Sequence, residues 1–176
     1  PATLGSGCEH GPRWYARHLV CNVTRAHVSN PTSALTDLLS GAIAATTQSH
    51  TDSCDTTHPG TPSATVAILR WTSADLQWLV LGDATVVMEV EGELQVVTDR
   101  RLGRTSARER EAVLAGGDTD GQRGTRIAAL SKAQRKFRNV EGGFWVAAAD
   151  PQAAYQSLTG AHAIGPNTRW RAALLT

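Results

Sequence analysis

The sequence predicts an α+β fold in which helices flank mostly antiparallel sheets. Apolar residues recur at helical spacing in the first 48 residues, and β-rich segments follow in close succession between residues 63 and 98. Contiguous strands that are joined by short turns pair antiparallel. We therefore expect layers of helix and sheet, in the order α, α, β, β, β, α, α, β.

Two helices are expected in the N-terminal third. Pro12 suits the first turn of a helix, and apolar residues continue at helical spacing from Trp14 to Val23. Asn30-Pro31 breaks the chain, and Thr32 or Ser33 can cap a second helix with apolar positions from Leu35 to Ala44. The polar, Pro- and Gly-containing segment 48–62 then predicts a loop.

Strand candidates follow this loop at 63–71, 76–81 and 86–98, the last being a hairpin that turns at Glu91-Gly92. The final segment, 168–176, is also read as a strand.

The second half of the chain is expected to be mostly helical. The pattern predicts a helix over 104–114 and a basic amphipathic helix or helix pair over 125–140, with a loop at 116–124 between them. DPQAAYQSLTG predicts a further helix, with Asp150 as its cap and Gly160 beyond its end.

Composition excludes several classes of protein. The 176 residues suit one domain, and a net charge of +1 with interspersed signs argues against nucleic acid or anionic membrane as a partner. No apolar run reaches the length of a membrane span. Cys8, Cys21 and Cys54 are an odd set at low density, which favours free thiols in a reducing cytosol. We therefore expect a cytoplasmic protein.

The ends of the chain suggest an interior portion of a longer domain. The sequence starts at Pro1, its only methionine is Met88, and it stops in the strand-like run RWRAALLT. We expect one domain over 1–176 that is truncated at both termini.

Two candidate sites come from the polar loop. His50, Cys54 and His58 are spaced four apart, and Cys8 with His10 could join them in a zinc site. Because Pro59-Gly60 argues against a helix there, the favoured interpretation is a polar loop without metal.

A nucleophilic triad of Ser63, His58 and Asp55 or Asp83 is also conceivable. The sequence around Ser63 lacks the glycine-flanked elbow of a hydrolase serine. We assign no catalytic residue.

The third candidate is LVLGDATVV, residues 79–87, where Asp83 interrupts a run that reads as buried strand. A buried carboxylate is costly unless something pairs with it. Two interpretations remain open: Asp83 forms a turn by bonding nearby backbone amides, or it faces a hard cation.

The order of these motifs resembles metal-dependent protein serine/threonine phosphatases of type 2C, in particular their divergent bacterial branch. The segment GTPSATVAILRW is followed by LQWLVLGDATVVMEVEGELQVVTD, in which Gly82-Asp83-Ala84-Thr85 stands at the position of the family's Gly-Asp-Ser motif. The helix CEHGPRWYARHL and the segment GGFWVAAADPQAAYQSLTG are also similar, so the resemblance covers nearly the whole chain.

The resemblance implies a four-layer αββα sandwich, incomplete here at both ends, and a signalling hydrolase. In the family, water activated by Mg²⁺ or Mn²⁺ attacks phosphoserine or phosphothreonine of a protein substrate. The resemblance implies that Asp83, with Gly82, lies at the metal cluster and contacts the metals largely through bound water. It places Ser63, Ala64, Thr65 and Thr85 near the site.

The chain departs from the family pattern at the other metal ligands. No Asp precedes Trp14, the early phosphate-binding arginine is missing, and the chain ends where the family carries an Asp-Gly pair after a late strand. Two interpretations follow: the interior of a longer active phosphatase, or a catalytically inactive regulatory or binding domain. In either case the 176-residue chain itself is expected to be inactive.

Overall fold

The computed structural model describes residues 7–105, 107–115 and 120–176. The helices are α1 (Pro12–Ser29), α2 (Leu35–Gln48), α3 (Arg101–Thr105), α4 (Ala107–Ala115), α5 (Asp120–Arg135) and the 3₁₀ helix η1 (Pro151–Gln156). The strands are β1 (Val66–Trp71), β2 (Asp75–Leu81), β3 (Thr85–Val90), β4 (Glu93–Thr98), β5 (Leu158–Ala163) and β6 (Trp170–Leu175). The predicted α+β class is confirmed.

The six strands form two antiparallel sheets of three, in the orders β1-β2-β5 and β4-β3-β6. The predicted hairpin between β3 and β4 is confirmed, and its turn residues Glu91 and Gly92 have φ angles of 51° and 88°. Positive φ at both central residues is the geometry that matches the twist of a two-residue hairpin.

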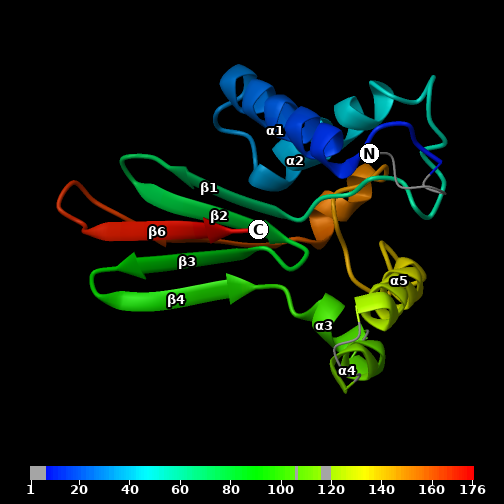
Figure 1. Ribbon diagram of the computed structural model, residues 1–176. Helices are drawn as coiled ribbons and strands as arrows, with labels where there is room; N and C mark the ends of the chain where they lie inside the picture. The colour runs from blue at the N-terminus through cyan, green and yellow to red at the C-terminus, as the bar shows by residue number, and fades with distance from the viewer. Residues whose placement is uncertain (1–6, 106, 116–119) are drawn as a thin grey trace.

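The elements stack as a helix layer on two sheets (Figure 1). One core lies between α1, α2 and the first sheet, where Tyr15, Leu39 and Leu79 are fully or almost fully buried. A second core lies between the two sheets and contains Leu76, Val86 and other inward-facing residues of β2, β3 and β4. Alternate residues of β2 therefore serve the two cores, as the period of two in a strand requires.

The other face of the second sheet has no covering layer among the described residues. Leu94 and Val96 of β4 are 67% and 58% exposed, and they lie opposite Glu89 and Val87 of β3. In β6 the neighbouring Leu175 is 55% exposed. Three layers are therefore present, and the predicted four-layer arrangement is not complete in the described chain.

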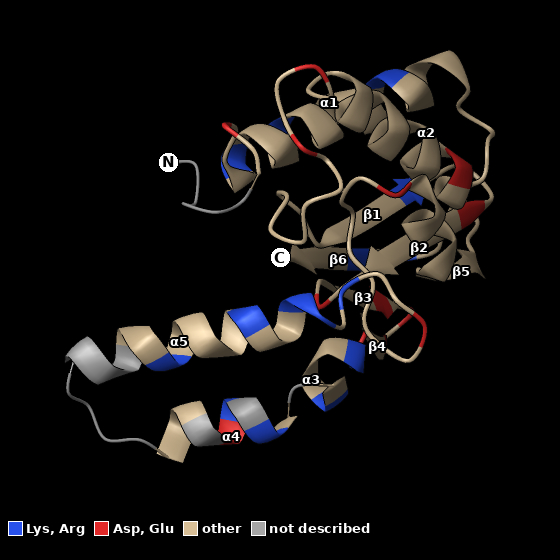
Figure 2. Ribbon diagram, turned by 90° about the vertical axis from the view of Figure 1, so that its right-hand side faces the viewer, with Lys and Arg blue, Asp and Glu red and all other residues tan. Residues whose placement is uncertain are grey.

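Helices α3, α4 and α5 extend from the end of β4 away from the sheets, and α4 packs with α5 (Figures 1 and 2). Lysine and arginine residues occur along all three helices (Figure 2). The predicted helix 125–140 instead begins at Asp120 and ends at Arg135. The predicted loop 116–124 lies partly outside the described residues, and its last five residues belong to α5.

The predicted helix at 150–160 is wrong in its second half. Asp150 does cap a helix, since its Oδ1 accepts a hydrogen bond from Gln152 N at 2.9 Å. This helix is the short η1, and Gly160 lies within β5, opposite Trp78 of β2. A Cβ at Gly160 would lie 2.3 Å from the Trp78 ring. Gly160 is therefore needed for close cross-strand packing and not to end a helix.

The described residues contain no helix of the length and apolarity needed to cross a membrane.

Candidate metal centre and the Asp83 turn

Asp83 lies in the turn between β2 and β3, which crosses from the first sheet to the second. Gly82 has a φ of 73°, and a Cβ there would approach Thr65 Cγ2 to 2.8 Å. The turn directs the side chain of Asp83 outward, so Asp83 is exposed between buried Gly82 and Ala84. The expectation of a buried carboxylate is therefore wrong, because a left-handed glycine rotates the chain before Asp83.

The Asp83 carboxylate makes no hydrogen bond or ion pair within the described parts of the chain. It does not bond neighbouring backbone amides, as a turn-forming aspartate does. Its oxygens are open to solvent.

The residues predicted near Asp83 gather at one end of the two sheets. Ala64 pairs with Ala147 by two backbone hydrogen bonds of 2.9 and 3.0 Å, and Thr65 contacts Gly82. Ser63 Oγ accepts a hydrogen bond from Arg138 Nη1 at 3.2 Å. Thr85 lies opposite Leu175 of β6. Their role at a metal cluster stays a prediction from the resemblance.

A second carboxylate at this end of the sheets, Asp99, has a structural role. It is 6% exposed and accepts hydrogen bonds from Arg101 N at 2.9 Å and Arg101 Nε at 2.8 Å. Its bonds with Arg101 hold the start of α3 against the end of β4. Both carboxylate oxygens of Asp99 are therefore engaged by Arg101, unlike those of Asp83.

A cluster of thiols and imidazoles lies where the start of α1 meets the end of α2. We call it the Cys₂His₂ cluster, and its members are Cys8, His10, His50 and Cys54. One potential ligand atom from each residue lies within 4.8 Å of the other three. The two N-terminal members immediately precede α1, and the two others follow α2, so the cluster closes the end of the α1–α2 pair.

The shortest contacts in the cluster join nitrogen to sulfur. His10 Nδ1 lies 3.3 Å from Cys54 Sγ and 3.8 Å from Cys8 Sγ, and His50 Nδ1 lies 3.6 Å from Cys8 Sγ. No disulfide links the cysteines of the described chain. His50 is 3% exposed, and its Nε2 has no hydrogen-bond partner among the described residues.

The two thiols of the cluster differ in acidity. Burial, with the nearby Cys54, raises the pKa of Cys8 to about 11. Burial also acts to raise the pKa of Cys54, but hydrogen bonds with Cys8, His50 and His10 outweigh it and lower that pKa to about 5. The pair therefore shares one thiolate near neutral pH, and a thiolate is the form in which cysteine binds metals.

Where α1 packs on α2, contacts between residues far apart in the sequence hold the segments that carry the cluster. The backbone N–H of Asp55 donates to Gly7 O at 2.8 Å, which places the segments before α1 and after α2 side by side. Gly7 has a φ of 69°, and a Cβ there would lie 2.6 Å from His58 Cβ. The indole of Trp14 packs against His10 in a tilted arrangement, with ring centroids 4.1 Å apart, and its centroid lies 5.0 Å from that of the His50 ring.

His58 is not part of the cluster. Its Nδ1 accepts a hydrogen bond from Gly60 N at 2.9 Å in a local turn. The segment after α2 is a series of turns, as expected of a polar loop, so the spacing of four from Cys54 does not put both residues on one face. Of the candidate ligands considered from the sequence, the structure brings together Cys8, His10, His50 and Cys54 but not His58.

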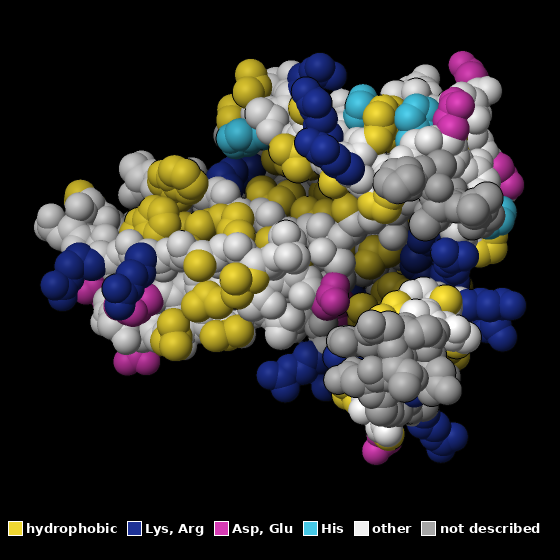
Figure 3. Space-filling model, viewed as in Figure 1, with side chains coloured by type: hydrophobic (Ala, Val, Ile, Leu, Met, Phe, Trp, Pro, Cys, Tyr) yellow, Lys and Arg dark blue, Asp and Glu magenta, His cyan; other side chains and the backbone are white. Residues whose placement is uncertain are grey.

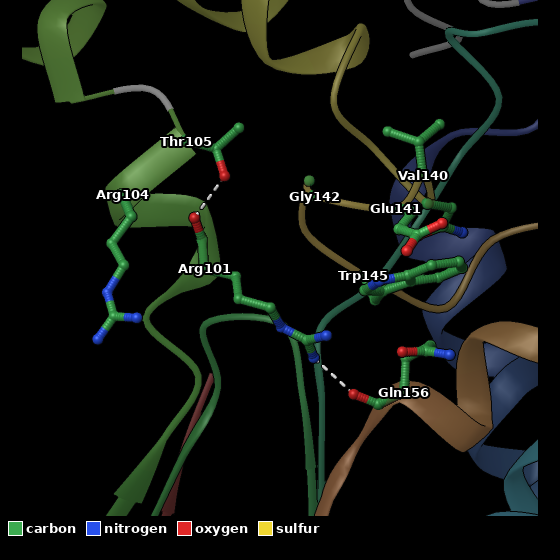
Figure 4. Close-up of a pocket in the computed structure, with 10 residues that line it drawn as sticks. Arg101, Arg104, Thr105, Val140, Glu141, Gly142, Trp145 and Gln156 are labelled. Carbon is green, nitrogen blue, oxygen red and sulfur yellow. Dashed lines mark hydrogen bonds between the residues drawn. The ribbon is translucent and has the colours of Figure 1, made fainter.

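A separate cavity of about 860 Å³ lies between α3 and the segment from Asn139 to Trp145. Arg101 crosses it and donates from Nη2 to Gln156 O at 2.5 Å, while the Arg104 side chain points away (Figure 4). Because Arg101 is already bonded to Asp99 and Gln156, this cavity presents no arginine prepared for an anion.

Comparisons with protein families, curated proteins and solved structures found no significant match for the chain. The assignment of function therefore depends on the geometry of the two sites and on the resemblance of the motifs.

Proposed function

We propose that this chain is the central part of a protein serine/threonine phosphatase domain of type 2C. The observation that carries the proposal is the position of Asp83, a solvent-facing carboxylate on the turn that links two stacked sheets, with no partner among the described residues. The complete domain would hydrolyse phosphoserine or phosphothreonine in protein substrates, with Mg²⁺ or Mn²⁺ as the cofactor.

The layered architecture supports this proposal. A four-layer αββα sandwich needs a helix layer, two face-to-face sheets and a second helix layer, and the first three are present. The outer face of β4-β3-β6, with Leu94 and Val96 exposed, is the face that the fourth layer would cover. We propose that helices outside this sequence, or a different placement of α3 to α5, complete it.

The open strand edges give further support. Among the described residues, β1 and β6 each have a neighbour on one side only. An apolar groove follows these edges from Leu19 and Val20 to Val66 and Leu174. Figure 3 shows hydrophobic side chains gathered between the helix layer and the strands on this side. Additional strands in a larger sandwich would pair here and bury them.

The donors available at the Asp83 turn suit a hard cation but do not complete a site. Carboxylate and water oxygens are the ligands of Mg²⁺ and Mn²⁺, and Asp83 offers one unpartnered carboxylate. Thr176, which follows β6, lines the same groove as Ala64 and Thr65, so residues that followed it in a longer domain would start beside this turn. The remaining ligands would have to come from there and from residues before α1.

The 176-residue chain is therefore expected to hydrolyse p-nitrophenyl phosphate no faster than a blank containing Mn²⁺. In the complete protein, Mn²⁺-dependent hydrolysis of a phosphothreonine peptide is expected. Asp83→Asn should lower kcat/KM at least about 10-fold in that protein, because an amide binds a divalent cation more weakly than a carboxylate does. The melting temperature should change little, because Asp83 makes no contact that the amide would lose.

A matched control is Glu93→Gln, which removes an exposed carboxylate at the opposite end of the same sheet. It should leave both the rate and the melting temperature unchanged. Hydrolysis by the 176-residue chain alone would contradict the account of its missing ligands. A complete protein that binds phosphopeptides without hydrolysing them would instead indicate an inactive regulatory domain.

A further inference from the structure

We propose that the Cys₂His₂ cluster binds a single Zn²⁺ ion as a structural site. This site is separate from the Asp83 turn and does not depend on phosphatase activity. Four observations support it: the ligand spacing, the donor chemistry, the burial of His50 and the position of the cluster in the fold.

The spacing of the donor atoms matches one tetrahedral ion. With Zn–S near 2.3 Å and Zn–N near 2.0–2.1 Å, a sulfur and a nitrogen on a tetrahedral Zn²⁺ lie about 3.6 Å apart. Of the four N···S pairs in the cluster, His10–Cys54, His50–Cys8 and His10–Cys8 are separated by 3.3, 3.6 and 3.8 Å. The ligand atoms are therefore already close to the positions that the ion requires, although they come from segments more than 40 residues apart in the sequence.

The donor types select a soft or borderline metal. Two sulfurs and two imidazole nitrogens favour Zn²⁺ over Mg²⁺ or Mn²⁺, which prefer oxygen. A two-iron cluster with this ligand set places its histidines on one iron and its cysteines on the other. Here His10 Nδ1 lies 3.3 Å from Cys54 Sγ, so nitrogen and sulfur are interleaved around one point. Four protein ligands also leave no open position, which is typical of a structural site.

The buried imidazole of His50 gives independent support. His50 is 3% exposed, its Nδ1 lies 3.6 Å from Cys8 Sγ, and the ring also interacts with the Cys54 thiol, so its partners within the described chain are the two thiols of the cluster. A buried polar group without a good partner is destabilising. Coordination of Zn²⁺ by Nδ1 would give this buried ring a stronger partner than a thiol, which is only a weak hydrogen-bonding group.

The site would fasten the start of α1 to the end of α2. Cys8 and His10 lie just before Gly11, the N-cap of α1, while His50 and Cys54 follow the last residue of α2. Between them the two helices pack on the first sheet through residues such as Leu39. One ion would therefore join the start of α1 to the end of α2 in the layer that covers β1 and β2, and its binding energy would stabilise the fold.

The test uses the full 176-residue chain under reducing conditions. Elemental analysis after reconstitution and desalting should find one Zn²⁺ per chain. Co²⁺ in its place should give thiolate-to-metal absorption in the near ultraviolet and the intense visible bands of tetrahedral Co²⁺. At free Zn²⁺ a thousandfold above Kd, the melting temperature should rise about 8–16 °C over the metal-free protein.

Variants separate this site from the alternatives. Cys54→Ser should weaken Zn²⁺ binding at least about 100-fold and reduce the Co²⁺ thiolate absorption. Cys21→Ser is a control because Cys21 is exposed and lies outside the cluster. His58→Asn is a second control, in which the asparagine oxygen can replace Nδ1 as the acceptor for Gly60 N. Both controls should keep one Zn²⁺ and the wild-type melting temperature.

If a variant fails to fold, Zn²⁺ and Co²⁺ binding by the metal-free wild-type chain still tests the proposal. The proposal is overturned if the reduced, folded wild type binds no Zn²⁺ tightly, or if it binds Co²⁺ without thiolate absorption. Purification with two irons per chain, or an equal loss of binding in His58→Asn and Cys54→Ser, would also overturn it.

Discussion

Replacing Gly143 by alanine is expected to destabilise the protein by about 3 kcal/mol, the upper end for an overpacked interior. A Cβ at Gly143 would lie 2.0 Å from the backbone oxygen of Phe137. This oxygen already accepts a hydrogen bond from Phe144 N at 2.9 Å, so neither segment can move without losing that bond. Chemical denaturation should show the loss, with a fall in melting temperature of about 6–12 °C.

Gly41→Ala provides the matched control for this substitution. Gly41 lies on α2, and a Cβ there would have no atom within 4 Å. Alanine is the better helix former by up to about 1 kcal/mol, so this variant should be slightly more stable than the wild type. Equal effects of the two substitutions would contradict the packing of Gly143 against Phe137.

Leu39→Ala is expected to cost about 2–5 kcal/mol, because it creates a cavity at the centre of the helix-to-sheet core. The side chain of Leu39 is fully buried between α2 and its neighbours. Thermal denaturation of the metal-free chain measures this cost without a contribution from bound ions.

The control for Leu39→Ala is Leu114→Ala on α4. Leu114 is 82% exposed, and its truncation should change stability by less than about 0.5 kcal/mol. If Leu39→Ala were as mild as Leu114→Ala, α2 would not be packed on the sheet as described.

Local patterns were sufficient to predict most of the elements. Pro12 at the start of α1, the Glu91-Gly92 turn and the Asp150 cap depend on neighbouring residues only, and the structure confirms each of them. Gly160 was misread because a glycine after an apolar helical pattern is also a common helix end. What decides its role is Trp78, more than 80 residues away in the sequence, and no local pattern contains that contact.

In the candidate sites, too, neighbouring residues reveal some features, whereas others depend on contacts between distant parts of the chain. The sequence around Asp83 reads as buried strand, but the exposure of Asp83 depends on the positive φ of Gly82. The members of the Cys₂His₂ cluster were visible as Cys8-x-His10 and His50-x₃-Cys54, two short pairs with no fixed spacing between them. Only the packing of α1 on α2 brings these pairs together, and the same packing leaves His58 outside.

X-ray absorption at the zinc edge of the reconstituted, reduced chain would test directly whether the Cys₂His₂ cluster binds the metal. The Cys₂His₂ cluster predicts two sulfur ligands at about 2.3 Å and two nitrogen ligands at about 2.0–2.1 Å. A first shell of nitrogen and oxygen without sulfur would contradict this account and would place the metal elsewhere in the protein.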